Sequence, residues 1–313
     1  MKRRRIKISK GIGALFSERL WSIDTSACSK WYARLVRLTR LIRITTDSFT
    51  RNHMGFQCVA LSYFAMLALV PLIGLMFAVT GGLGLSNLIT EVLYKIFPAN
   101  PEFVEIMIEK ASGILAEAER GGTGLVSALL FLWAIIWMMV QVERVFNNIW
   151  NIRKIPRKIY TRFGFYILVM FLLPFIVLIF GAGIAYHVTL PNLLGLDLAD
   201  LNFLSRLLAF VGLYAVSVLT LSAMYTFIPA TKVRYRHAVK SAALAAIVFV
   251  IFQYLYLETQ VFVGRLSIAY GVIAAIPLFL IWMNISWQII IFGAELTYGF
   301  QNLDNYRPQK WDS

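Results

Sequence analysis

Long apolar runs separated by short polar connections are the most regular feature of this chain. Six of these runs hold about 20 or more mostly apolar residues, the length that an α-helix needs to cross a hydrocarbon layer of ~30 Å. They cover residues 56–80, 124–146, 163–187, 204–228, 239–263 and 270–298. Strands of a membrane β-barrel would alternate polar and apolar residues at every second position, and these runs do not. The pattern therefore predicts an all-α, polytopic membrane protein with six transmembrane helices.

Composition supports a membrane setting and removes several other classes. Of the 313 residues, 59% are hydrophobic and 15% are charged, against about 45–50% and about 25% in typical soluble domains. So few charged residues cannot cover a water-exposed surface, which excludes a soluble enzyme, a secreted disulfide scaffold and a disordered chain. The two cysteines, Cys28 and Cys58, have no partner at metal-ligand spacing.

Basic residues are concentrated on one side of the predicted bundle. The N-terminal arm, the end of the second span, the second-to-third and fourth-to-fifth connections and the tail hold 25 of the 30 Lys and Arg residues. Cytoplasmic connections are enriched in Lys and Arg, so this asymmetry predicts that both termini are cytoplasmic. Three regions result: a basic arm at 1–54, a six-span membrane domain at 55–298 and a tail at 299–313.

An amphipathic pattern precedes the first span. Between residues 31 and 44, apolar residues recur at helical spacing among Arg34, Arg37, Arg40 and Arg43. This pattern is typical of a helix that lies on the anionic inner leaflet, although positive charge that only holds the N-terminus inside produces the same sequence. No folded basic domain accompanies the arm, so nucleic acid is not expected as a partner.

The connection at residues 81–121 is long and acidic, and its apolar residues also keep helical spacing. We expect two amphipathic helices, broken at Pro98 and Pro101, because proline interrupts a helix. They would rest on the outer membrane face or cap a cavity. A helical hairpin that only ties two spans together fits the same pattern.

Polar residues inside a lipid-spanning helix are costly, so their positions are a guide to function. In the last span Asn284, Gln288 and Glu295 are separated by four and seven residues, which at about 100° per residue places them on one face. Pro277 lies on the same face and permits a kink. We expect a polar stripe that faces a cavity and runs to the cytoplasmic end.

A second polar cluster, Glu143, Arg144 and Asn147, ends the second span. Glu143 and Arg144 are neighbours in sequence and do not face each other, so each needs a partner on another helix. An ion pair between Arg144 and Glu295 would satisfy two of these charges. Gln253, in the middle of the fifth span, must face protein or water. The polar groups are interpreted either as structural contacts between helices or as a gate or ion-coupling site.

Prolines interrupt three of the predicted spans. Pro71, Pro174 and Pro277 are candidate hinges, since transporters use broken helices around a central site. Residues 179–186, IFGAGIAY, resemble residues 291–298, IFGAELTY, at the ends of the third and sixth spans. This internal similarity favours the hypothesis of two inverted three-helix halves.

The sequence offers no set of residues for catalysis. The three histidines, His53, His187 and His237, are scattered. Paired aspartates for magnesium and a glycine-rich phosphate loop are absent from the sequence. We therefore expect neither enzymatic activity nor a metal or other cofactor.

Four segments of the membrane domain have a recognisable sequence: LSYFAMLALVPLIGLMFAV (61–79), VERVFNNIWNIRK (142–154), FIPATKVRYRHAVKSAALAA (227–246) and AYGVIAAIPLFLIWMNISWQIIIFGAELT (269–297). They resemble the YihY/BrkB family of bacterial inner-membrane proteins, over roughly residues 50–300. The resemblance implies six spans and a location in the bacterial cytoplasmic membrane. The matching positions include Pro277, Gly293, Ala294 and Glu295.

Members of that family have been described as a ribonuclease (ribonuclease BN), as a serum-resistance or virulence factor, and as transporters linked to lipid or envelope export. The residues give no support to the ribonuclease label, because metal clusters of the nuclease type are missing.

These features predict a transporter or flippase-like protein for a lipid-related or amphipathic envelope compound, in which Glu143, Arg144 and Glu295 control the cytoplasmic side. The alternative is a non-transporting membrane scaffold or envelope-integrity (serum-resistance) factor whose arm and outer connection recruit partners. Membrane lipids are the expected partners. An oligomer is compatible with the sequence, and the substrate and energy source are left open.

Overall fold

The computed structural model describes residues 20–21, 29–81, 86–96, 101–119, 123–152, 160–169, 172, 176, 202–266 and 271–303. Within these ranges the regular elements are helices, and no strand occurs. The helices are α2 (Lys30–Arg51), α3 (Met54–Gly81), α4 (Ser86–Ile96), α5 (Pro101–Glu119), α6 (Thr123–Ile149), α8 (Asn202–Phe227), α9 (Tyr235–Leu266) and α10 (Gly271–Asn302). Residues 160–169 are also helical. The all-α prediction is confirmed for this part of the chain.

Four of the described helices are long and apolar enough to cross a membrane. The membrane-length segments are Met54–Val79 of α3, Phe210–Phe227 of α8, Tyr235–Thr259 of α9 and Ile276–Asn302 of α10. They correspond to the first, fourth, fifth and sixth predicted spans. The second predicted span is helix α6, which is not among the four, and most of the third lies outside the described residues. The count of six and the two inverted halves stay predictions.

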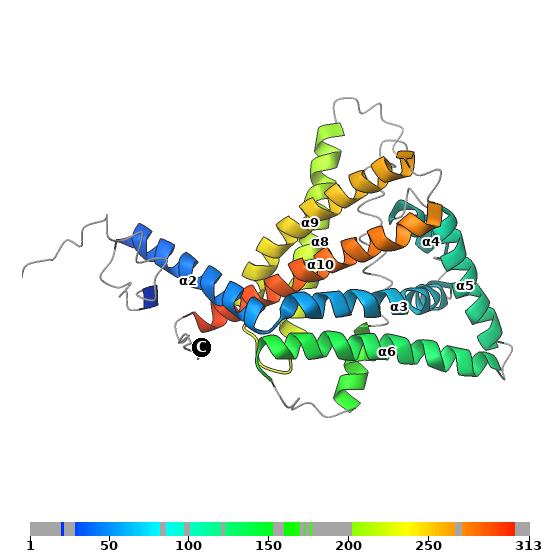
Figure 1. Ribbon diagram of the computed structural model, residues 1–313, viewed down its shortest axis with the longest axis horizontal. Helices are drawn as coiled ribbons and strands as arrows, with labels where there is room; N and C mark the ends of the chain where they lie inside the picture. The colour runs from blue at the N-terminus through cyan, green and yellow to red at the C-terminus, as the bar shows by residue number, and fades with distance from the viewer. Residues whose placement is uncertain are drawn as a thin grey trace, which may run out of the picture.

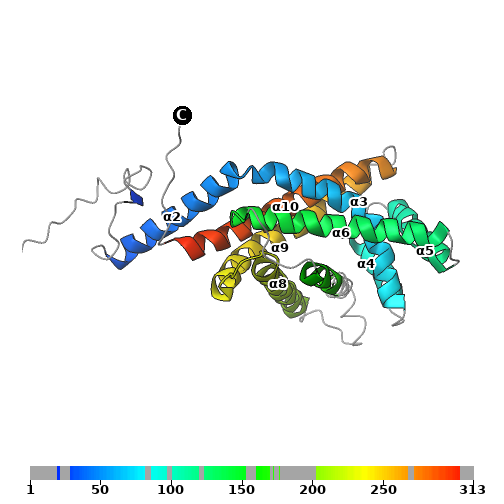
Figure 2. The same ribbon diagram turned by 90° about the horizontal axis from the view of Figure 1, so that it is seen from below.

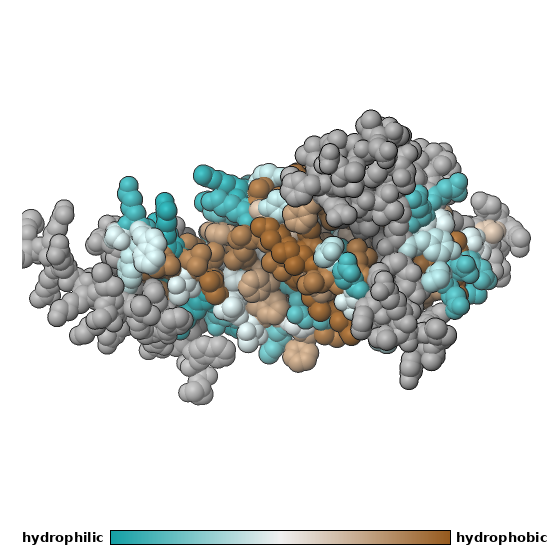
Figure 3. Space-filling view, turned by 90° about the horizontal axis from the view of Figure 1, so that it is seen from above, coloured by the Kyte–Doolittle hydropathy of each residue, from teal (hydrophilic) through white to brown (hydrophobic). Residues whose placement is uncertain are grey.

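The exterior of these helices carries many large apolar side chains, including Tyr63, Leu67, Trp133, Leu219 and Tyr254, each more than half exposed. Figure 3 shows hydrophobic residues gathered across the middle of one face, with hydrophilic residues toward both ends. A soluble protein does not expose a contiguous apolar surface of this extent. The band is therefore the surface that faces lipid.

The long helices lie side by side, with α10 in a central position. Helix α10 contacts α9 and α3, α3 contacts α6, and α8 packs on α9. Figure 2 shows α3 on one side of α10, and α8 and α9 on the other. The helices α4 and α5 lie at one end of the bundle, and α2 and the last turns of α10 lie at the opposite end (Figure 1).

One hydrophobic core joins α3, α6, α8, α9 and α10 and contains Phe146, Tyr225 and Trp287. Gly293 permits the close approach of α10 to α9, because a Cβ at that position would lie 2.8 Å from the Cβ of Ala245. Large side chains from these five helices thus fill the space between them.

A second core holds α4 and α5 against the bundle. It includes Ile73 of α3, Ile89 of α4, Phe103 and Met107 of α5 and Phe279 of α10. The expected pair of helices is confirmed, and Pro101 starts α5, where its missing N–H is not needed. The two helices do not only connect spans, since their apolar faces cover the ends of α3 and α10.

Helix α2 packs one face on α10 and extends past the bundle (Figure 1). Ile44, Thr45 and Ser48 are buried in this contact, and a Cβ at Gly299 would lie 2.9 Å from Cδ1 of Leu41. The α2–α3 break occurs at His53, whose φ of 50° is left-handed. Helix α2 is therefore joined firmly to the membrane bundle at its C-terminal half.

Candidate functional site

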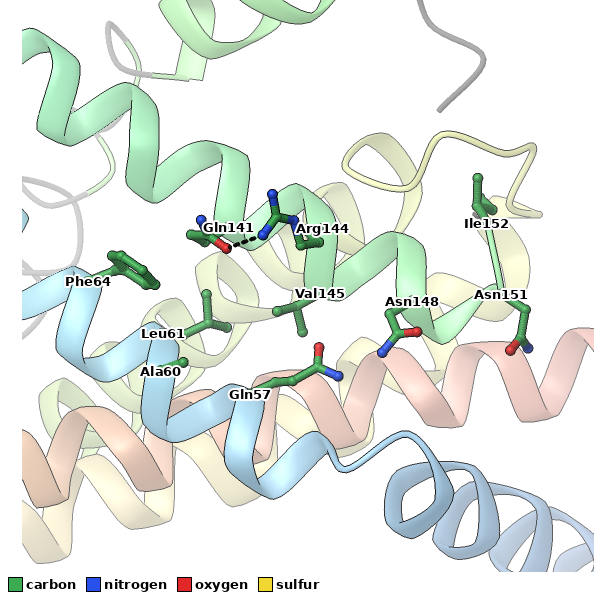
Figure 4. A pocket seen from close by; sticks show the side chains of 10 residues that line it. All are labelled: Gln57, Ala60, Leu61, Phe64, Gln141, Arg144, Val145, Asn148, Asn151 and Ile152. Carbon is green, nitrogen blue, oxygen red and sulfur yellow. Dashed lines mark hydrogen bonds between the residues drawn. The ribbon is translucent and has the colours of Figure 1, made fainter. Parts of the chain in front are cut away.

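A pocket of about 510 Å³ lies between α3 and α6, near the end of the bundle that carries α2. Figure 4 shows the amides of Gln57 and Asn148 reaching into the space between the two helices. The pocket is lined by Gln57, Ala60, Leu61 and Phe64 from α3 and by Gln141, Arg144, Val145, Asn148, Asn151 and Ile152 from α6 and the turn that follows it. The volume is within the usual range for small-ligand sites.

Arg144 supplies the positive charge of this pocket. Its side chain is exposed, and Nη1 donates a hydrogen bond of 3.3 Å to Oε1 of Gln141. Within the described ranges, Arg144 forms no ion pair with a carboxylate. The rest of the lining combines carboxamides with apolar side chains, and both helices contribute residues of each kind. Such a lining suits a ligand that has an anionic or polar head and an apolar body.

The carboxylate next to Arg144 faces away from the pocket. The Glu143 side chain is 3% exposed, and its Oε2 accepts two hydrogen bonds, of 2.9 and 2.8 Å, from Arg162. Tyr166 also donates its hydroxyl proton to the same oxygen. Burial acts to lower the pKa of Arg162, but the hydrogen bonds to Glu143 and Tyr166 outweigh it and raise that pKa above its usual value. Glu143 therefore joins α6 to the helical residues 160–169.

Asn147 is also turned inward. Its Oδ1 accepts a hydrogen bond of 2.7 Å from the backbone N–H of Ala230, in the turn between α8 and α9. Gln253 of α9 is buried and accepts a hydrogen bond of 3.0 Å from Nε1 of Trp282. Both residues were predicted as members of a polar cavity or gate. In the structure Asn147 joins α6 to the α8–α9 turn, and Gln253 joins α9 to α10.

The polar stripe of α10 has different surroundings along its length. Gln288 is exposed and donates a hydrogen bond of 2.7 Å to Oδ1 of Asn284. Glu295 is fully buried at the α2 contact. None of the three residues lines the α3–α6 pocket. The stripe occupies one face of the helix, as predicted, but different neighbours cover that face at different heights.

Glu295 lies close to Ser48, Arg51 and Asn52 of the α2 end. The expected ion pair with Arg144 is not formed, because Arg144 lines the α3–α6 pocket while Glu295 is buried against the end of α2. That expectation is wrong. Glu295 is instead a buried acid next to the break between α2 and α3.

Comparison with known proteins places the chain in a family. The sequence model of the family described as virulence factor BrkB matches residues 45–313. The chain belongs to the virulence factor BrkB family. This confirms the resemblance found in the membrane domain, and no solved structure matches the chain.

Relatives of this BrkB-family chain include proteins that carry the name UPF0761 membrane protein. The chain is 29% identical over 281 residues to that of Chromohalobacter salexigens, covering 85% of this chain and 64% of the relative. It is 29% identical over 261 residues to that of Pseudomonas aeruginosa, with coverages of 81% and 61%. It is 26% identical over 271 residues to that of Mannheimia succiniciproducens, with coverages of 84% and 90%. The chain therefore spans less than two thirds of the length of the first two relatives. Membership of this family shows that the chain is a membrane protein.

The candidate hinge prolines of this BrkB-family chain differ in how far they are buried. Pro71 is buried inside α3, and Pro277 is exposed inside α10. Pro174 lies outside the described residues. The surface arginines differ too, since Arg34 and Arg37 are exposed while Arg40 donates hydrogen bonds of 3.2 and 2.9 Å to the carbonyl oxygen of Leu20.

Several site residues were missed by reasoning from the sequence. Gln57 lies in the first turn of α3 and reads as the edge of an apolar run. Arg162 was counted only as a topology signal, although it is the partner of Glu143. The described residues hold no group of three or more His, Cys, Asp or Glu side chains that could bind a metal ion.

Proposed function

We propose that this BrkB-family protein is a transporter or flippase-like protein of the bacterial inner membrane that handles a lipid-related or amphipathic envelope compound. It would cross the bilayer six times, with both termini in the cytoplasm. One observation carries the proposal: a pocket lined by a single cation, several carboxamides and several apolar side chains opens between two helices of an apolar bundle. An amphipathic compound is the ligand class that satisfies both kinds of lining residue.

Glu295 is the residue proposed to control movement on the cytoplasmic side. A buried carboxyl group is costly in a membrane helix, and ionisable residues in membrane helices are commonly functional. Glu295 lies where α10 meets the α2 end, so a change in its charge would alter that contact. Pro71 and Pro277 are the proposed hinges, because a proline leaves a carbonyl of its helix without a partner.

The proposal is tested by exchanging Glu295 for Gln. The purified protein is reconstituted into liposomes that contain fluorescently tagged phosphatidylglycerol, and lipid movement between leaflets is followed by dithionite quenching. Glu295→Gln keeps the side-chain volume and removes the charge, so we expect movement to fall to the rate of protein-free liposomes while protein abundance and unfolding midpoint stay unchanged.

Glu105→Gln is the matched control, because Glu105 is an exposed carboxylate on α5 at the opposite end of the bundle. This control should move lipid at the wild-type rate. Wild-type activity in Glu295→Gln would contradict a gating role. A wild-type protein that moves none of the tagged lipid would remove phosphatidylglycerol from the candidate compounds.

A non-transporting scaffold is the second candidate, and helix α2 is the observation that favours it. This helix extends beyond the bundle and exposes Trp31, Leu38 and Ile42 beside Arg34 and Arg37. A scaffold would lose its envelope phenotype in an Arg34→Gln/Arg37→Gln variant, whereas a transporter with an intact bundle would keep it. Removing residues 1–50 is a poorer test, because that deletion would also strip the cover from Glu295.

A further inference from the structure

We propose that the α3–α6 pocket binds the phosphate headgroup of an anionic phospholipid, with Arg144 as its anchor, and that one acyl chain lies along the apolar surface beside it. The inference rests on the proposed function and deepens it, since it names the class of compound and the residue that recognises it. Three features of the pocket carry it: its charge, its neutral donors and the surface that continues from it.

The charge in the pocket is positive and is not neutralised by its neighbour. The adjacent carboxylate, Glu143, is buried on a different face of α6 and is bound to Arg162. A guanidinium group has five N–H donors in a planar fork that matches phosphate oxygens. The hydrogen bond from Arg144 to Gln141 involves one nitrogen, Nη1, so the group retains donors for a ligand.

The remaining polar lining is neutral, so it does not repel an anion. Gln57 donates its amide N–H to the carbonyl oxygen of Asn52 at 2.8 Å, which fixes its side chain at the pocket. The carbonyl groups that end α6 are partly satisfied, since Asn151 N–H bonds to Asn148 O and Ile152 N–H to Asn147 O, both at 3.0 Å. The negative end of the α6 dipole is thereby weakened where the headgroup would lie.

An exposed apolar surface continues from the pocket along both helices. On α6, Trp137 lies four residues before Gln141 and seven before Arg144, on the same helix face. Trp133 precedes it by one turn, and the two rings are 5.2 Å apart. On α3, Leu67 lies one turn beyond Phe64. Trp133, Trp137 and Leu67 are 58%, 43% and 55% exposed.

The length of this surface matches one leaflet. The helix rise from Arg144 to Trp133 is about 16 Å at 1.5 Å per residue, close to half of the ~30 Å hydrocarbon core. A headgroup at Arg144 would therefore sit at the interface, with its acyl chain reaching toward the bilayer centre. A free phosphate ion would contact only the polar lining residues and leave the apolar surface beside the pocket uncovered.

The experiment measures lipid binding to the detergent-purified full-length protein by native mass spectrometry. The probes are dioleoylphosphatidylglycerol, dioleoylphosphatidylcholine and inorganic phosphate. We expect wild type to prefer phosphatidylglycerol and Arg144→Gln to bind it about ten-fold more weakly, the loss expected for charge-assisted hydrogen bonds. Arg144→Lys keeps the charge but not the fork, so its loss should be smaller. Ala60→Phe fills the pocket and should weaken binding without touching the charge.

Arg236→Gln is the matched control, because Arg236 is an exposed arginine in the first turn of α9 and lies outside both the pocket lining and helix α2. Its affinity for phosphatidylglycerol should equal that of wild type. The unfolding midpoint without added lipid should be unchanged in Arg144→Gln, whose side chain is exposed.

Two results would overturn the assignment: equal affinity of wild type, Arg144→Gln and Ala60→Phe for phosphatidylglycerol, or displacement of the lipid by inorganic phosphate at comparable concentration. The second result would make the pocket a free-anion site. Binding that depends on Arg144, in a protein that moves no lipid in liposomes, would contradict the transport proposal and leave the binding site intact. Transport without Arg144-dependent binding would contradict the proposed binding site and leave the transport proposal intact.

Discussion

The two faces of α6 at its last turns have opposite roles, although their residues alternate in sequence. Glu143 and Asn147 face the bundle interior and are bound to Arg162 and Ala230. Arg144 and Asn148 face the α3–α6 pocket. The comparison teaches that polarity in a membrane helix indicates function only when the partner of each group is known. The paired face holds the fold together, and the open face is available to a ligand.

The largest effect should come from breaking the pair on the closed face. Glu143→Ala leaves Arg162 partly buried without its carboxylate, and we expect a loss of about 3–5 kcal/mol in the free energy of unfolding. The measurement is denaturation of the purified protein in mixed detergent micelles. Arg144→Gln, one residue along the chain, should unfold as wild type does.

A double variant sharpens this test. Glu143→Ala/Arg162→Leu removes both charges, so it should be more stable than Glu143→Ala alone. If the single and double variants were equally unstable, the lost contact would be packing and not the ion pair.

A smaller effect should follow from adding one methyl group where α10 packs in the core. A Cβ at Gly293 would lie 2.8 Å from Ala245 Cβ and 2.9 Å from Cζ of Tyr225, so Gly293→Ala should cost about 1–3 kcal/mol by overpacking. The same measurement on Gly212→Ala is the control. No atom lies within 4 Å of a Cβ at Gly212, and that variant should gain about 0.5–1 kcal/mol from helix preference.

The smallest effect should come from Asn147→Ala, which leaves the N–H of Ala230 without its side-chain acceptor. We expect a loss of about 1 kcal/mol, because Ala230 is only half-buried and water can replace part of the bond. Asn148→Ala on the open face should cost less. An equal loss of unfolding free energy in both variants would mean that the asparagines on the two faces of α6 contribute equally to stability.

Much of the fold was predictable, because each long helix is specified by local sequence. Apolar length predicted α3, α8, α9 and α10, and the prolines at 98 and 101 predicted the break between α4 and α5. The amphipathic spacing of α4 and α5 also anticipated that one face of each would be covered. The sequence could not show which helices cover those faces, since that depends on segments far away in the chain.

The candidate site was less predictable, because its members are paired by tertiary contacts. Asn284, Gln288 and Glu295 share a helix face, as their spacing indicates. The end of α2 covers Glu295, while Gln288 is exposed seven residues earlier. Likewise, Glu143 and Arg162 are 19 positions apart, and only the course of the chain between them decides that they meet. Gln57 became a site residue only once α3 and α6 were placed side by side.

The cap that α4 and α5 form over α3 and α10 has a consequence for any cargo of this protein. Side chains of Ile89, Phe103 and Phe279 pack together and fill the described part of that end of the bundle. A ligand held between α3 and α6, as proposed, would therefore be expected to keep its tail in the bilayer along the outside of the helices instead of passing through this part of the bundle.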